Sequence, residues 1–151
     1  MKKIVWIFIA VMLVACGDRK QQEAELMLER AKTLFAERHY DRALIVIDSL
    51  RKVYPKAIDI RKQALKLYQD VELQQAQETL AMTDSVLEIV KKDYERQKIE
   101  VEKKKSELRA TPEELTRLTK TRVLRDSLQT EFEMLCAKIR YIHKKQKELQ
   151  N

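Results

Sequence analysis

The side chains that could carry out catalysis or bind a metal are few and widely separated in this 151-residue chain. The two histidines, His39 and His143, lie far apart, and no metal-ligand spacing is present around them. The adjacent carboxylates Glu113 and Glu114 follow a proline and suit the first turn of a helix, where the helix dipole favours negative charge. A single glycine leaves no glycine-rich loop to bind phosphate. The sequence therefore predicts a protein that is not an enzyme and has no metal or cofactor.

Cys16 stands apart from these residues because of the segment that precedes it. Two lysines near the start of the chain are followed by eleven apolar residues, 4–14, and then by Ala15. As a helix this apolar run would span roughly 16 Å, which is too short for a hydrocarbon core of about 30 Å. Residues 1–15 are therefore predicted to be a targeting segment rather than a membrane-spanning helix.

The four residues Leu13-Val14-Ala15-Cys16 resemble the lipobox of bacterial lipoproteins. In that family the chain is cut before the cysteine, whose sulfur and new amino terminus are acylated. The resemblance implies a membrane anchor of palmitate-type chains on Cys16. Gly17, and not an aspartate, follows the cysteine; by the same resemblance this favours the outer membrane, facing the periplasm. The alternative is an ordinary signal peptide followed by an incidental cysteine.

The composition of residues 16–151 predicts an all-α fold. Gly17, Pro55 and Pro112 are its only glycine and prolines, and good helix formers dominate. The full chain has 31 basic residues, of which Lys2 and Lys3 precede Cys16. Residues 16–151 therefore have 29 basic and 24 acidic residues and a net charge of +5. The signs are interspersed, which is typical of solvated helix surfaces, and no aromatic residues punctuate the basic runs, so nucleic acid is not an expected partner. Cys136 is then the one cysteine besides Cys16; it is expected to be a small apolar residue or to pair between chains.

Residues 23–70 are predicted to form a helical cluster, after a polar tether of residues 16–22. The apolar spacing predicts a first helix, a polar corner at residues 37–41 with Asp41 as an N-cap, and a second helix that stops at Tyr54-Pro55. The expected inner residues are Leu26, Met27, Ala31, Leu34 and Phe35 in the first helix and Ala43, Leu44, Ile47 and Leu50 in the second.

This region resembles one tetratricopeptide repeat. The residues that match the repeat pattern are Ala31, Leu34, Phe35, Tyr40, Ala43 and Pro55. The pattern departs at Met27, where tryptophan is usual, and at Arg38, where the corner glycine is usual. Stacked repeats bind peptides in a groove, but about three repeats are usually needed for stability. Tyr40 and Ala43 are therefore candidate partner-binding residues, and a packing module without a ligand is the alternative.

Residues 71–151 are predicted to form a long antiparallel coiled-coil hairpin. One seam recurs every seven residues: Leu73, Leu80, Leu87, Tyr94, Val101 and Leu108. The expected returning seam includes Leu128, Leu135, Ile142 and Leu149. A capping box that begins a new helix is predicted at Thr111 and Glu114, with Pro112 at the first helical position. The turn is therefore expected near residues 109–112.

Folding the hairpin about Thr111 predicts that the numbers of paired residues sum to about 222, which places Gln97 against Arg125 and Tyr94 against Leu128. The alternative is a rod-like homodimer of parallel helices.

Basic residues gather near this turn, and Lys103, Lys104 and Lys105 are candidate binding residues there. The predicted function is a noncatalytic, membrane-anchored adaptor with a protein partner in the cell envelope. The alternative is an electrostatic binder of acidic envelope polymer or lipid headgroups.

Overall fold

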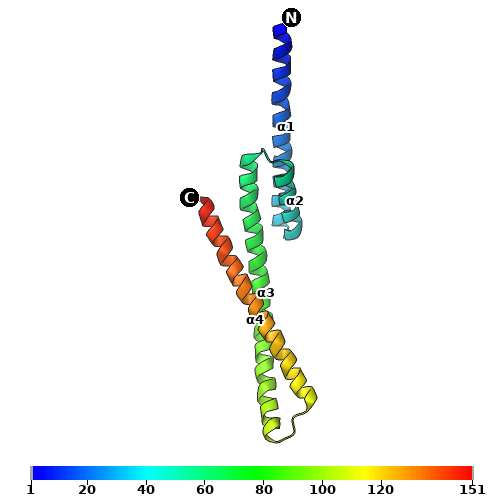
Figure 1. Cartoon of the computed structure of the whole chain (residues 1–151), viewed down its shortest axis with the longest axis vertical. Coiled ribbons are helices and arrows are strands. Elements are labelled where there is room, and N and C mark those ends of the chain that lie inside the picture. Colours follow the sequence, from blue (N-terminus) through cyan, green and yellow to red (C-terminus); the bar gives the residue numbers. More distant parts are fainter. Residues whose placement is uncertain (1, 151) are drawn as a thin grey trace. The chain divides into compact units, whose positions relative to one another are not determined.

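The computed structural model describes the backbone of residues 2–150 and the side chains of residues 19–149. Over these residues the chain forms four helices and no strand: α1 (Lys2–Ala36), α2 (Tyr40–Val53), α3 (Ile58–Ser106) and α4 (Pro112–Gln150) (Figure 1). This confirms the all-α prediction, and the near absence of glycine and proline is its physical cause. The chain divides into two compact units, Met1–Leu73 and Gln74–Asn151. The boundary falls within α3, so the start of this helix belongs to the first unit and the rest to the second.

Helix α1 begins well before the position at which the apolar spacing predicted a helix. Residues 16–22, the predicted tether, lie within α1. The stretch contains no proline, and its one glycine costs only about 1 kcal/mol in a helix, so nothing local ends the helix there. The side chains of the targeting segment and of Cys16 lie outside the described residues.

The core of the first unit is built where α1, α2 and the first turns of α3 meet. Its buried members are Ala24, Leu28, Ala31, Ala43, Ile47, Leu50, Ile60, Ala64, Leu67 and Val71. The placement of Leu26 on the inner side of α1 was wrong, because its side chain is 70% exposed. The buried line of α1 instead follows Ala24, Leu28 and Ala31 at helical spacing, and residue 26 lies about 200° around the helix from residue 24.

The corner between α1 and α2 closes through a left-handed residue. Arg38 has φ of 60°, its N–H donates to the carbonyl of Phe35 at 3.0 Å, and the His39 N–H donates to the carbonyl of Leu34 at 2.8 Å. These are the two hydrogen bonds of a Schellman motif, in which glycine usually occupies the left-handed position.

This corner changes the predicted start of α2. Asp41 is not the N-cap: α2 begins at Tyr40, directly after the corner, with His39 as the preceding residue. Asp41 lies in the first turn of α2, where its charge still suits the helix dipole. The helix ends at Val53, before Tyr54-Pro55 as predicted.

In the second unit α3 and α4 are joined by a short turn, and Figure 1 shows α4 returning from it toward the opposite end of α3. The side chains buried here are Ala76, Thr83, Leu87, Gln97, Val101 and Ile142. Of these, Leu87, Val101 and Ile142 lie on the predicted seams. Leu108 was also predicted to lie on the seam, but it is 95% exposed, because α3 ends two residues earlier, at Ser106.

The register of the helical pair differs from the predicted one by about one helical turn. The hydroxyl of Thr121 donates to Gln97 Oε1 at 3.3 Å, and the guanidinium of Arg125 lies 4.2 Å from the centroid of the Tyr94 ring. Pair numbers therefore sum to 218 and 219, and the predicted pairing of Gln97 with Arg125 and of Tyr94 with Leu128 was wrong. The cause is the turn, whose centre falls midway between Ser106 and Pro112 rather than at Thr111. Leu149, which was predicted to lie on the returning seam, is 53% exposed.

Candidate functional site

The three predicted lysines lie in the last turn of α3 and differ in their surroundings. Lys103 and Lys105 are exposed, whereas Lys104 is half-buried. The Lys104 ammonium donates to Glu100 Oε1 at 2.9 Å and also to a carboxylate oxygen of Glu114 on α4. Lys104 therefore joins α3 to α4, and its charge is shared between two carboxylates.

The electrostatics of this group follow from the same contacts. The hydrogen bonds that Lys104 donates to Glu114 and then to Glu100 raise the pKa of Lys104 above its usual value. In return, Lys104 is the largest cause that lowers the pKa of Glu114, followed by the backbone N–H of Thr111, and it also lowers the pKa of Glu100. All three groups are held in their charged forms near neutral pH.

The turn beside these residues is capped on both sides. The Thr111 N–H donates to Glu114 Oε2 at 3.1 Å and the Glu114 N–H donates to Thr111 Oγ1 at 3.3 Å, which confirms the predicted capping box. On the α3 side, Leu108 has φ of 56°, and the Arg109 N–H donates to the Lys104 carbonyl at 2.8 Å in a second Schellman turn. Hydrogen bonds thus define the path of the backbone through the turn.

The surface that this turn presents is defined here as the tip: Lys103, Lys105 and Leu108, all exposed. Leu108 was missed by sequence reasoning because its seven-residue spacing assigned it to the seam. The signal that could have found it is its place just before a helix restart, where the chain must leave the helix.

The two candidate residues of the repeat-like region lie in different environments. Ala43 is fully buried in the core of the first unit, so its side chain serves packing. Tyr40 is half-buried, and its ring centroid lies 6.1 Å from that of Phe35 in a tilted arrangement. Of the two, Tyr40 alone has side-chain surface that a partner could contact.

The part of the chain whose side chains are described holds no metal-binding cluster. No three His, Cys, Asp or Glu side chains of that part form a group that could hold a metal ion. Cys136 is a free, half-buried thiol. None of the helices, over the residues described, is both long enough and apolar enough to span a bilayer.

The fold defines the class of the protein as all-α, with two compact helical units. No family model, no curated protein and no solved structure matches the chain. The resemblances to a lipobox and to a tetratricopeptide repeat remain predictions from the sequence.

Proposed function

We propose that this protein is a noncatalytic lipoprotein, anchored through acyl chains on Cys16, that acts as a protein-interaction adaptor in the cell envelope. The observation that carries the proposal is the position of Cys16, directly after the apolar run and before the first charges, Asp18 to Lys20. Several acyl chains on one residue would hold the protein stably, because each buried methylene contributes about 0.8 kcal/mol and a single chain is marginal. The proposed location is the outer membrane, facing the periplasm.

The exposed apolar side chains of the second unit support a protein partner. On α3 Met82, Val86 and Ile89 follow one another at spacings of four and three residues, which puts them on one face of the helix, and Met134 and Tyr141 of α4 are also exposed. Contiguous exposed apolar surface is typical of docking sites for other proteins. The length of α4, 39 residues or about 58 Å, gives such an arm considerable reach.

Anchoring is tested by replacing Cys16 with serine and fractionating cells. We expect the wild-type protein in the membrane fraction with the added mass of acyl chains, and the Cys16→Ser protein without that mass. An unchanged mass and an unchanged membrane fraction in Cys16→Ser would overturn the proposal. A Cys136→Ser variant is the matched control, because it removes the other thiol and leaves the proposed anchor intact.

Electrostatic binding of acidic polymer is the second candidate, and the tip is the observation that favours it. Lys103 and Lys105 are both exposed in the last turn of α3, on different sides of the helix. Lys104 is a weaker candidate for such a role than its neighbours, because Glu100 and Glu114 already accept its hydrogen bonds.

A further inference from the structure

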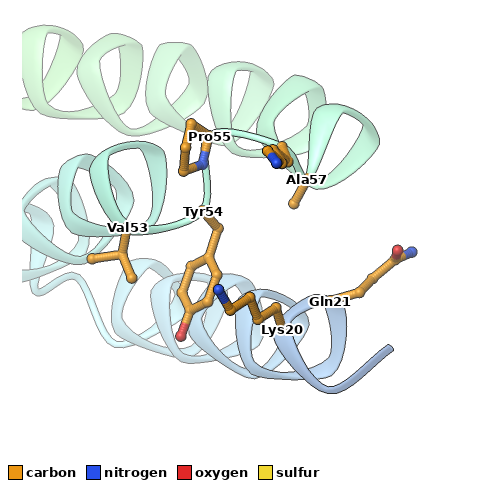
Figure 2. A pocket seen from close by; sticks show the side chains of 7 residues that line it. Lys20, Gln21, Val53, Tyr54, Pro55 and Ala57 are labelled. Atoms are coloured by element: carbon orange, nitrogen blue, oxygen red, sulfur yellow. The ribbon is translucent and has the colours of Figure 1, made fainter. Parts of the chain in front are cut away.

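A cavity of about 510 Å³ lies in the first unit between α1 and the segment that joins α2 to α3. Its lining residues are Lys20 and Gln21 from α1 and Val53, Tyr54, Pro55, Lys56 and Ala57 from the end of α2 and the joining segment. Figure 2 shows Lys20 of α1 beside the ring of Tyr54, with Pro55 and Ala57 on the joining segment across the space from α1. The cavity thus brings together two parts of the chain that are more than thirty residues apart.

The charged side chains that line the cavity, Lys20 and Lys56, are both basic. Among the residues whose side chains are described, neither Lys20 nor Lys56 has an ion-pair partner. The neighbouring carboxylate, Glu23, is already engaged: Arg19 Nε lies 3.9 Å from Glu23 Oε1, and the Tyr54 hydroxyl donates to Glu23 Oε2 at 3.1 Å. Two lysines are therefore left to bind an anion.

The Tyr54 hydroxyl remains a neutral donor beside these lysines. Burial, and then the hydrogen bond to Glu23, raise the pKa of Tyr54 above its usual value. The rest of the wall is apolar, formed by Val53, Pro55 and Ala57. The lining thus combines two cations with an aliphatic surface, which suits an amphipathic anion.

The position of the cavity along α1 indicates which anion would reach it. Helix α1 runs through Cys16 and Lys20 without a break. At 1.5 Å per residue, Lys20 lies about 6 Å along the helix axis from Cys16. The headgroup layer on each side of a bilayer is about 5–8 Å thick. An anchor on Cys16 would therefore hold the cavity at the depth of the lipid headgroups.

We infer that this cavity binds the phosphate of an anionic phospholipid from the membrane that holds Cys16, with Lys20 and Lys56 as its ligands. The inference rests on the proposed anchoring at Cys16. Ammonium groups bind phosphate as point charges through charge-assisted hydrogen bonds, and basic pockets near a membrane surface bind anionic headgroups in the same way.

The test uses the full-length lipidated protein in nanodiscs that contain phosphatidylcholine and phosphatidylglycerol. Lipids that remain bound after release are counted by native mass spectrometry for wild type, for Lys20→Gln/Lys56→Gln and for Lys103→Gln/Lys105→Gln. The last variant is the matched control, because it loses the same charge at exposed lysines of the tip. We expect retained phosphatidylglycerol to fall about tenfold in the first double variant and to stay unchanged in the control.

Equal retention in wild type and Lys20→Gln/Lys56→Gln would overturn the inference, and so would an equal loss in both double variants, which would indicate bulk charge alone. A second arm adds soluble glycerol phosphate; displacement of the lipid by it at comparable concentration would assign the site to a free phosphate instead. The acyl mass on Cys16 is read from the same spectra. Its absence would overturn the anchoring proposal and, with it, the placement of the cavity at the depth of the headgroups. Equal lipid retention with the acyl mass present would overturn the lipid-binding inference alone.

Discussion

Leu108 has a left-handed backbone conformation, which costs free energy, and its side chain is not packed against the rest of the protein. A left-handed conformation costs a residue with a Cβ roughly 1–2 kcal/mol, and Leu108 has φ of 56°. Its side chain is 95% exposed, so burial offsets none of this cost. Arg38 has a similar φ of 60° at the other corner. A leucine at the tip is therefore not explained by the stability of the turn.

Replacing Leu108 with glycine should stabilise the second unit. Glycine removes the left-handed penalty but gains freedom in the unfolded chain, so we expect a net gain of about 0.5–1 kcal/mol in the free energy of unfolding. Urea denaturation followed by circular dichroism would measure it. Lys105→Gly, inside the last turn of α3, should instead destabilise by a similar amount. A loss of stability in Leu108→Gly would mean that the Schellman turn is absent in solution.

The Glu114 carboxylate should make stability depend on acid pH. Its pKa is lowered in the folded protein by Lys104 and then by the Thr111 N–H. This stabilisation is present above the unfolded glutamate pKa of about 4.3 and is lost as the pH falls through the lower folded pKa. Glu114→Gln should therefore lower the urea midpoint at neutral pH and reduce its fall toward acid pH.

Glu113→Gln is the control for this pH series, because it removes the same charge from the adjacent position without the contacts to Lys104 and Thr111. An equal reduction of the acid dependence in Glu113→Gln and Glu114→Gln would mean that helix-dipole effects account for the result. The contact between Glu114 and Lys104 would then not be needed to explain it.

At the scale of the helices, the register of α3 against α4 is the feature that most affects function, because it decides which side chains share a surface. The hydrogen bond between Thr121 and Gln97 lies about two and a half helical turns from the ends of α3 and α4 at the loop, so it reports the register away from the turn itself. A register shift of one turn displaces side chains by about 5.4 Å along the helix.

Paired cysteines would test this register directly. In a Cys136→Ser background, Gln97→Cys/Thr121→Cys should form a disulfide within one chain under mild oxidation, because a disulfide needs its Cα atoms within about 7 Å. Gln97→Cys/Arg125→Cys, the pair predicted from the sequence alone, should form it much more slowly. Non-reducing gels and peptide mapping would distinguish the two. Disulfides only between chains would instead support the rod-like homodimer.

At the scale of the whole molecule, the two compact units carry different candidate binding features of the proposed adaptor. The first unit carries the cavity near the proposed anchor, and the second carries exposed apolar residues and the tip. Docking through apolar surface and docking through lysines respond differently to salt, since exposed charges farther apart than about 10 Å are screened at 0.1 M salt.

Partner capture in isolated envelopes should therefore persist at high salt. We expect crosslinking of the second unit to its partner to change little with ionic strength, because apolar burial does not depend on screening. Ile89→Lys, at a residue that is 69% exposed, should abolish capture with little effect on thermal melting. A steep fall of capture with salt, together with loss in Lys103→Ala/Lys105→Ala, would contradict the apolar mode and favour binding of an acidic polymer.

Features that depend on residues a few positions apart could be predicted from the sequence. Pro55 ends α2 and Pro112 begins α4, because proline restricts the backbone around it wherever the rest of the chain lies. The capping box at Thr111 needs only a hydroxyl and a carboxylate three residues apart. The inner faces of α3 and α4 followed from helical periodicity for the same reason.

How these local elements pack against one another could not be predicted from the sequence, because it depends on contacts between distant residues. The register depended on the centre of the turn, and no glycine marked the left-handed residue, Leu108, that sets it. The inner line of α1 depended on which side α2 covers, so Leu26 could not be distinguished from Leu28 by apolar character. The cavity between Lys20 and Lys56 arises from the packing of the first unit, and neither residue carries a local signal of the other. Contacts between distant residues depend on the geometry of corners and turns, which the periodicity of apolar residues does not predict.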